Sequence, residues 1–261
     1  MSEETLIAPI GVLAFRHASV LAGRCARISS RNLDAVIMSV MLPVMLLLMF
    51  VYLFGGALNT GGRYLTYVIP GVLLLCAGFG AATTAVTVSQ DMTSGIMDRL
   101  RSMNVSAPAF LSGHVAASVA RNAMATVCVS AVAVAIGFRT SSGAAQLLLA
   151  IGVLAAYVVA ISWLAAAAGL LAKTPESANG FTFLFMFLPY ASSAFVPIST
   201  MPTWLQGFAR NQPVTPLVET MRGLLVGTPV GNAPVRGALW CVGLLIVSVA
   251  GSGVLFRRRT R

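Results

Sequence analysis

The sequence is poor in charged residues and rich in apolar ones. Only 9% of its 261 residues are Asp, Glu, Lys or Arg, whereas 57% are hydrophobic. This composition excludes a soluble domain of this length, because too few polar side chains are present to cover a surface in water. The mean hydropathy of +0.87 indicates instead a polytopic membrane protein, which we expect to be all-α.

Several patterns that carry enzyme or metal chemistry are also missing. The four cysteines form no C-x-x-C pair and no cluster with the two histidines, so neither a disulfide framework nor a metal site is supported. No H-E-x-x-H or G-x-S-x-G motif is present, which argues against an intramembrane enzyme. The single lysine, Lys173, follows an apolar run and not the glycines of a Walker phosphate-binding loop. We therefore expect no catalytic residue and no cofactor bound by this chain.

Long hydrophobic runs dominate what is present. Six of them reach the about 20 residues that cross a bilayer, and they predict spans at about 35–54, 66–89, 116–137, 144–172, 178–198 and 237–256. Of the 17 basic residues, twelve lie on the side of the N-terminus and five on the other side. The positive-inside rule then places both termini in the cytoplasm. This distribution also explains the net charge of +10 without binding to nucleic acid.

The chain divides into three parts. Residues 1–31 form a cytoplasmic N-terminus, residues 32–258 the six-span domain, and residues 259–261 a basic tail. Four arginines of the first part share one helical face opposite apolar residues: Arg16, Arg24, Arg27 and Arg31. This pattern is typical of an amphipathic helix that lies flat on an anionic leaflet. The alternative is a surface anchor without a further role.

Residues 90–112 are an amphipathic interruption between the second and third runs. Their apolar residues recur at the spacing of one helix face: Met92, Ile96, Leu100 and Met103. Asp91 stands where an N-cap is expected, and Pro108 lies beyond the far end. The pattern predicts a short cytoplasmic helix. On periodicity alone, this helix either docks a partner or only connects two spans.

Arg121 is the one charge that falls well within a predicted span. It lies about one turn inside the third span, and so close to a helix start its guanidinium can reach the head groups. We expect this arrangement and not a contact with substrate. No other ionisable residue falls near a predicted midplane, which argues against a proton-coupled or ion-coupled transporter.

The fifth run is rich in aromatic residues. Alternate spacing spreads these rings around a helix, so that some must face lipid. Phe183, Phe187 and Tyr190 are candidates to line a path for an apolar substrate. Plain packing is the alternative, and Pro189 is a predicted kink.

Five prolines punctuate the external segment after the fifth run, and two short helices fit between them. The first, 203–211, carries Trp204 and Phe208, and the second, 217–226, carries Glu219 and Arg222 as an i, i+3 pair. Aromatic rings at this edge are typical of an interfacial belt. The more specific prediction is a re-entrant helical cap on the outer face.

Four stretches resemble the ABC transporter type-2 permease family, in particular the drug exporters of the daunorubicin-resistance type. They cover residues 30–56, 90–106, 171–206 and 211–227, and they hold features similar to the family's Arg-Asn entry, acid-Arg-Leu loop, Thr-Pro-Glu turn and Asn-x-Pro cap. Asn104 departs from this pattern, because the family usually has a proline after the cytoplasmic helix.

The resemblance implies a half-transporter in a bacterial plasma membrane. Two such subunits, identical or related, would each dock a separate ATPase subunit that binds ATP and Mg²⁺, and would export a hydrophobic or amphipathic drug or lipid. In the family the short cytoplasmic helix inserts into a groove of the ATPase. The residues that would do so here are Asp91, Gly95, Asp98, Arg99, Leu100 and Arg101. The competing interpretation is a structural or regulatory membrane subunit that transports nothing.

Overall fold

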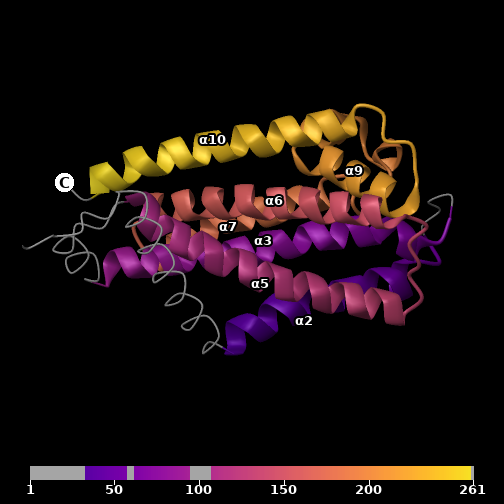
Figure 1. The fold of residues 1–261 in the computed structure, drawn as a ribbon, viewed down its shortest axis with the longest axis horizontal. Helices are drawn as coiled ribbons and strands as arrows, with labels where there is room; N and C mark the ends of the chain where they lie inside the picture. The colour runs from indigo at the N-terminus through magenta and orange to yellow at the C-terminus, as the bar shows by residue number, and fades with distance from the viewer. Residues whose placement is uncertain (1–32, 58–61, 95–106, 260–261) are drawn as a thin grey trace, which may run out of the picture.

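The described part of the chain is built from helices. The computed structural model describes residues 33–57, 62–94 and 107–259, and no strand occurs within these ranges. The elements follow in this order: α2 (Leu33–Met49), the π-helical turn η1 (Phe50–Phe54), α3 (Tyr64–Thr93), α5 (Ala107–Ala135), α6 (Ala144–Leu171), α7 (Pro175–Tyr190), the 3₁₀ turn η2 (Ile198–Thr200), α8 (Thr203–Asn211), α9 (Val214–Val226) and α10 (Ala233–Arg259). The long helices lie side by side along one axis (Figure 1). The expectation of an all-helical chain is confirmed for these residues.

Four of these helices are long and apolar enough to cross a membrane: α3, α5, α6 and α10. A shorter apolar helix, Ser39–Phe54, covers part of α2 and all of η1, and α7 has 16 residues. At 1.5 Å per residue α7 measures about 24 Å, less than the about 30 Å of a hydrocarbon core. The count of six spans therefore stays a prediction.

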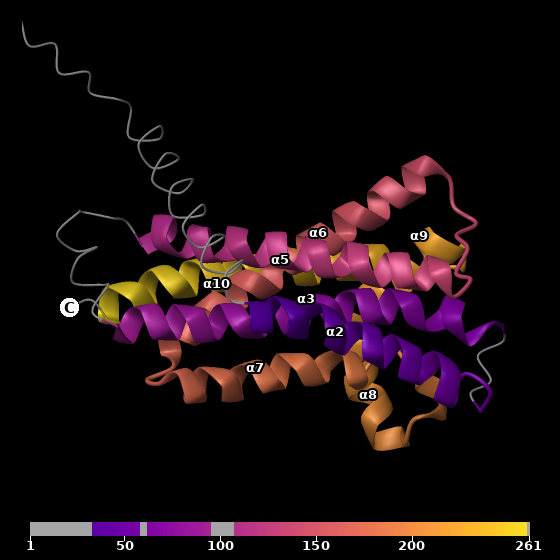
Figure 2. The same cartoon turned by 90° about the horizontal axis from the view of Figure 1, so that it is seen from below.

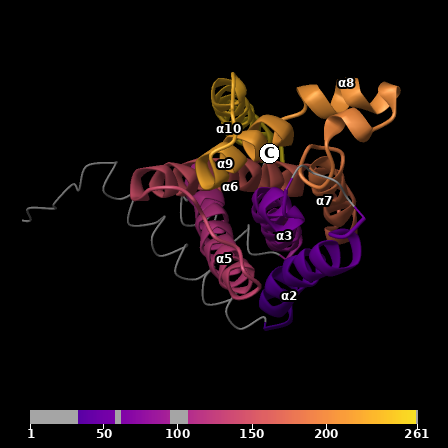
Figure 3. The same cartoon turned by 90° about the vertical axis from the view of Figure 1, so that its right-hand side faces the viewer.

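Helix α3 lies at the centre of the bundle. It packs against α2, α5, α6 and α7, which surround it when the molecule is viewed along its long axis (Figure 3). Two glycines let its neighbours approach. A Cβ atom on Gly71 would lie 2.5 Å from the Cβ of Ala194, and one on Gly80 would lie 2.3 Å from Oδ1 of Asn122. Small residues thus serve close packing in this membrane-type bundle.

Two boundaries differ from the sequence prediction. The third span was expected from residue 116, but α5 begins at Ala107, because the polar residues Ser112 and His114 lie inside the helix and not before it. The fifth span was expected to reach residue 198, but α7 ends at Tyr190, just after Pro189. A non-helical turn, residues 191–196, continues the chain.

This turn is packed inside the protein, and side chains from other elements bond to its carbonyl groups. Gln212 donates from Nε2 to the carbonyl oxygens of Leu188 and Ala191, each at 2.9 Å. The Tyr64 hydroxyl donates to the carbonyl of Phe195 at 2.9 Å. Irregular backbone is tolerated at membrane depth only where protein groups satisfy it in this way. The helix can therefore stop at Tyr190 without leaving these carbonyl groups unpaired.

The two ends of the bundle are built differently. The end of α3, the start of α5, the α6–α7 connection and the end of α10 lie together at one end, whereas α8 and α9 lie at the other (Figure 1). The predicted helix 203–211 has the bounds of α8. Helix α9 begins at Val214 and not at residue 217, because Pro216 is accommodated in its first turn. We call the first end the loop end, since residues 95–106 connect the two helices there.

Candidate functional site

A row of aromatic rings runs along the outer face of α7. Phe183, Phe187 and Tyr190 follow one another at i, i+4 and i+7, so their side chains share one face of the helix. The ring centroids of Phe183 and Phe187 are 5.4 Å apart, and those of Phe187 and Tyr190 are 6.3 Å apart. All three side chains are exposed on the isolated chain. The three predicted path residues therefore form one continuous surface.

Beyond Tyr190 the row leaves α7 and reaches the end of α2. Phe195, in the turn after α7, stacks on Tyr190 at 5.3 Å and on Phe50 at 4.4 Å. Phe50 opens the π-helical turn η1 and lies 5.6 Å from Phe54. Turns of this kind are frequent at functional sites. We call the following set the aromatic row: Phe183, Phe187, Tyr190, Phe195, Phe50 and Phe54.

Sequence reasoning found only half of this row. Phe195 was placed inside the predicted fifth span, and Phe50 inside the first, with no reason to bring them together. Their contact joins two segments far apart in the chain, and no periodic pattern encodes such a contact. The role of these rings in a substrate path stays a prediction.

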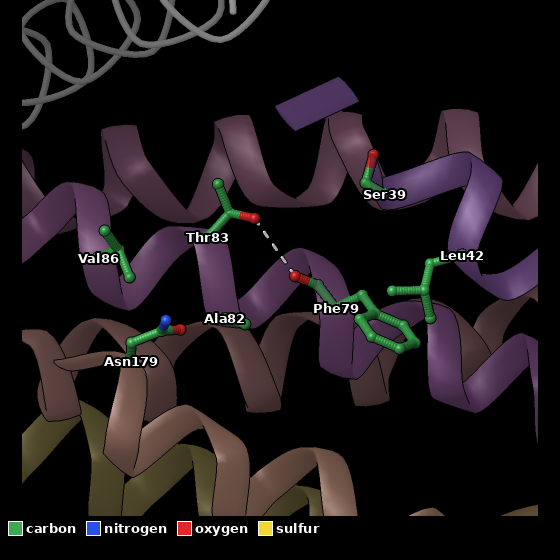
Figure 4. Close-up of a pocket in the computed structure, with 7 residues that line it drawn as sticks. All are labelled: Ser39, Leu42, Phe79, Ala82, Thr83, Val86 and Asn179. Atoms are coloured by element: carbon green, nitrogen blue, oxygen red, sulfur yellow. Dashed lines mark hydrogen bonds between the residues drawn. The ribbon is translucent and has the colours of Figure 1, made fainter. Parts of the chain in front are cut away.

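A pocket of about 280 Å³ lies near the other end of the row, between α2, α3 and α7. It is lined by Ser39, Leu42, Phe79, Ala82, Thr83, Val86 and Asn179. Figure 4 shows the Ser39 and Thr83 hydroxyl groups and the Asn179 amide distributed around the pocket, with the Phe79 ring at one side. The Thr83 hydroxyl donates to the carbonyl of Phe79 at 3.4 Å. The lining is mainly apolar, with three polar side chains and no charge.

The pocket and the row share one face of α7. Asn179 precedes Phe183 by four residues, and Phe187 follows after four more. This spacing puts the pocket's amide and the first rings on one stripe. The pocket lies toward the loop end and the row leads away from it, because α7 begins at the loop end and η1 closes the far end of α2. Figure 2 shows α7 lying beside α3 along this direction.

The predicted docking segment lies mostly outside the described residues. Of its six predicted docking residues only Asp91, in the last turn of α3, is described. The other five lie outside the described residues: Gly95, Asp98, Arg99, Leu100 and Arg101. The four arginines of the predicted interfacial helix lie outside them too: Arg16, Arg24, Arg27 and Arg31. These assignments stay predictions.

Asp91 does not act as an N-cap, because α3 continues through it to Thr93. Its carboxylate Oδ2 instead lies 3.2 Å from Nε2 of His114 on α5, a contact that becomes an ion pair when the imidazole is protonated. The His114 ring is buried and meets the Phe110 ring edge-on at 4.9 Å. The contact therefore joins α3 and α5 at the base of the loop between them.

The position predicted for Arg121 is wrong. Its side chain is buried, with 6% of its surface exposed, and does not reach the head groups. One guanidinium nitrogen donates to the carbonyl of Gly80 at 3.2 Å and to the Thr84 hydroxyl at 3.0 Å. The error follows from the boundary of α5. Since this helix begins at Ala107, Arg121 lies about 21 Å along it, where its guanidinium bonds to α3.

The predicted external helices differ in how they pack. Helix α9 buries Leu217, Val218 and Met221 in the bundle, where it contacts α3, α6 and α10. Helix α8 projects away from the bundle (Figures 2 and 3). Trp204 and Phe208 on α8 are 79% and 52% exposed. These two rings have the exposure expected of an interfacial belt.

Arg222 fastens α9 to α3 and to the turn after α7. Its guanidinium donates to the carbonyls of Tyr67 at 3.2 Å and Ser193 at 2.8 Å. It also lies 3.8 Å from the centre of the Tyr67 ring, a cation–π contact. Burial lowers the pKa of Arg222, whereas the nearby Tyr67 and Glu219 raise it. The predicted partner Glu219 forms no ion pair with it among the described residues, so Arg222 bonds to backbone carbonyls instead.

Comparison with known proteins identifies the family of this chain. Residues 17–226 match the family described as "ABC-2 type transporter". The chain belongs to the ABC-2 type transporter family. The resemblance seen in the four sequence stretches is therefore confirmed, and the matched residues include the aromatic row, the pocket and α9.

Two relatives carry related names. The chain is 31% identical over 219 residues to "Daunorubicin resistance ABC transporter permease protein DrrB1" of Streptomyces coeruleorubidus, which covers 83% of this chain and 75% of the relative. It is 23% identical over 231 residues to "Probable doxorubicin resistance ABC transporter permease protein DrrC" of Mycobacterium tuberculosis, covering 88% and 84%. Both relatives are permease proteins of ABC transporters. This ABC-2 member is likewise a multi-pass membrane permease.

Proposed function

We propose that this permease is the membrane subunit of an ATP-driven exporter that moves a hydrophobic or amphipathic molecule, a drug or a lipid, out of the cell. The observation that carries this proposal is the continuity between the pocket and the aromatic row. Asn179 of the pocket and Phe183 of the row lie one turn apart on the same face of α7. A molecule bound in the pocket would meet the first ring of the row without crossing a polar surface.

The chemistry of the path indicates the class of substrate. The pocket offers two hydroxyls and one amide in an apolar lining, and its volume is just below the about 300 Å³ at which ligand pockets begin. It would hold one end of an amphipathic molecule. No charged side chain occurs among the residues of the pocket and the row, so a hydrophobic or amphipathic substrate fits better than an inorganic ion or a sugar polymer. The relatives' names, which refer to daunorubicin and doxorubicin resistance, support a drug of that kind.

The rings would provide a graded surface and not a single tight site. An aromatic pair contributes about 0.5–1.5 kcal/mol beyond the burial of its area. The exposed rings Phe183, Phe187 and Tyr190 would offer such contacts in sequence, whereas Phe195 is buried and stacks on Tyr190 and Phe50. A substrate would therefore move along α7 over weak contacts, without a deep energy minimum.

Energy for this movement would come from a separate ATPase subunit, which holds ATP and Mg²⁺. That subunit docks at the loop end through the amphipathic N-terminus and the helix predicted at residues 92–103. A second permease subunit, of the same or a related chain, completes the exporter. With both termini in the cytoplasm, the loop end faces the ATPase, and alternating access opens the path first inward and then outward.

Substitution of the row tests the path most directly. We expect Phe187→Ala and Tyr190→Ala to change the relative export rates of two drugs several-fold, because one lost stacking contact of about 1 kcal/mol alters affinity about fivefold. Phe181→Ala is the matched control. Phe181 is exposed on the same helix but is not part of the row. Export rates should be measured in inside-out membrane vesicles together with the amount of each variant.

If Phe187→Ala and Tyr190→Ala both export every drug as the wild type does, the row has no role in the path. If the complex hydrolyses ATP but no substrate changes its rate, the chain is a structural or regulatory subunit and not an exporter.

A further inference from the structure

A seam of buried polar side chains joins α3 to α5, and it continues from the loop end to the middle of both helices. We propose that this seam makes α3 and α5 one rigid hairpin that transmits movement of the loop into the membrane, with His114 and Arg121 as its positioning residues. This inference rests on the proposed function. We call the following set the polar seam: Gly80, Thr84 and Asp91 of α3, His114, Ser118, Arg121 and Asn122 of α5, and Ser162 of α6.

The members of the seam are spaced as two facing stripes. On α5, His114, Ser118 and Arg121 fall at i, i+4 and i+7, on one face of the helix. On α3, Gly80, Thr84 and Asp91 fall at i, i+4 and i+11, again on one face. The stripe on α3 is about 17 Å long. The seam therefore connects the base of the loop with the interior of the bundle.

Each level of the seam holds a contact between the two helices. At the loop end, Asp91 and His114 meet at 3.2 Å. One level deeper, the Ser118 hydroxyl donates to the carbonyl of Gly80 at 3.4 Å and accepts from the Ser162 hydroxyl at 2.8 Å. Arg121 completes the seam with its bonds to Gly80 and Thr84. The side chains of His114, Ser118 and Arg121 are all buried.

Sliding of α5 along α3 would break these contacts together. Because these side chains are buried, breaking their bonds would cost free energy. Asn122 also lies against Gly80, where not even a methyl group would fit. Interlocked surfaces of this kind have discrete positions and do not deform smoothly. The pocket, in contrast, lies where α3 meets α2 and α7. Movement that opens the path is therefore expected at that interface and not within the hairpin.

The seam is relevant to function because it begins at the loop that is predicted to dock the ATPase. Residues 95–106 leave the end of α3 and return at the start of α5. When an ATPase moves this loop, a locked hairpin carries the displacement to the middle of the membrane. Without the seam, α3 and α5 would slide past each other, and ATP would be hydrolysed without transport.

A chemical cross-link across the seam tests this inference. The experiment uses the complete complex, purified with its ATPase and reconstituted in vesicles, after replacement of the four native cysteines. In the double variant Asp91→Cys, His114→Cys, we expect transport per ATP to fall at least fivefold while hydrolysis continues. Bridging the two thiols with a short bifunctional maleimide should restore transport per ATP to within twofold of the wild type, because the bridge replaces the lost contact. The single variant His114→Cys with the same reagent is the control.

Arg121→Lys and Arg121→Met give an independent measurement. Lysine keeps a donor for the Gly80 carbonyl, so Arg121→Lys should retain most of the coupling between ATP hydrolysis and transport. Arg121→Met should lose this coupling although its complex still assembles. Full coupling of the unbridged double variant, or no recovery after bridging, would overturn the inference but leave the exporter function standing. If no substrate stimulates hydrolysis by the wild-type complex, the proposed function fails, and the inference fails with it.

Discussion

Arg222 shows how a single residue ties the outer segment to the membrane helices. It reaches from α9 to the carbonyls of Tyr67 on α3 and Ser193 in the turn after α7, and lies against the Tyr67 ring. Sequence reasoning singled out Arg222 but paired it with Glu219, its neighbour on the helix surface. The actual acceptors belong to distant segments. No local spacing could have identified them.

We expect Arg222→Gln to destabilise the permease by about 2–3 kcal/mol, because a hydrogen bond to a charged group is worth about 1.5–3 kcal/mol and the cation–π contact adds to it. Thermal unfolding in detergent measures this change. Arg210→Gln is the control, since Arg210 is exposed at the end of α8. Equal midpoints for the two variants would show that the Arg222 contacts contribute nothing to the fold.

Gly80 gives a second residue-scale prediction, since a methyl group there would clash with the amide of Asn122. Gly80→Ala should destabilise the protein by about 1–3 kcal/mol, the usual cost of overpacking. Gly152→Ala, where nothing lies within 4 Å of the added atom, should be neutral or slightly stabilising because alanine is the better helix former. The two unfolding midpoints should therefore move apart. A Gly80→Ala variant as stable as Gly152→Ala would contradict the close contact between α3 and α5.

At the scale of elements, proline positions were a better guide than hydrophobic run length. The bounds of α8 were predicted correctly, because Pro202 and Pro213 delimit it. The start of α5 was missed, since Ser112 and His114 make its first turns look like loop. This one boundary also caused the wrong placement of Arg121. Polar residues in a membrane helix become recognisable as buried only when their partners on neighbouring helices are known.

The end of α7 shows a similar limit. The hydrophobic run continues to residue 198, and its local signal, the predicted kink at Pro189, does not tell a bend from the end of the helix. The turn is possible because Gln212, Arg222 and Tyr64 bond to carbonyl groups around it. It is also what brings Phe195 against Phe50 and extends the aromatic row. A structural feature supported from three distant elements cannot be read from its own segment.

The docking segment at residues 90–106 leads to a prediction at this scale. Asp98→Asn and Arg101→Gln should uncouple ATP hydrolysis from transport at least several-fold, because charges at a helix-in-groove contact set its register. The permease itself should remain folded, with an unchanged unfolding midpoint. Transport per ATP in reconstituted vesicles measures the effect, and Arg139→Gln, on the opposite side of the predicted membrane, is the control. Wild-type coupling in both variants would mean that the segment only connects two spans.

At the scale of the whole molecule, the described helices form a layered arrangement around α3. On one side, α5 binds α3 through the polar seam, and Ser162 of α6 bonds to Ser118 of α5. On another, α2 and α7 hold the pocket and the aromatic row. We interpret α3, α5 and α6 as the part that transmits force, and the interface of α3 with α2 and α7 as the part that opens. Composition predicted the membrane bundle and its helical class, but the different roles of these two parts are inferred from contacts between helices.

We have proposed that this permease exports a substrate with energy from a separate ATPase. To test this, the tagged chain should be purified from its native membrane, and vanadate-sensitive ATP hydrolysis measured with and without hydrophobic drugs. We expect a stoichiometric ATPase subunit whose turnover rises with substrate. Recovery of the chain alone, or of an ATPase that no substrate stimulates in native lipid, would contradict it.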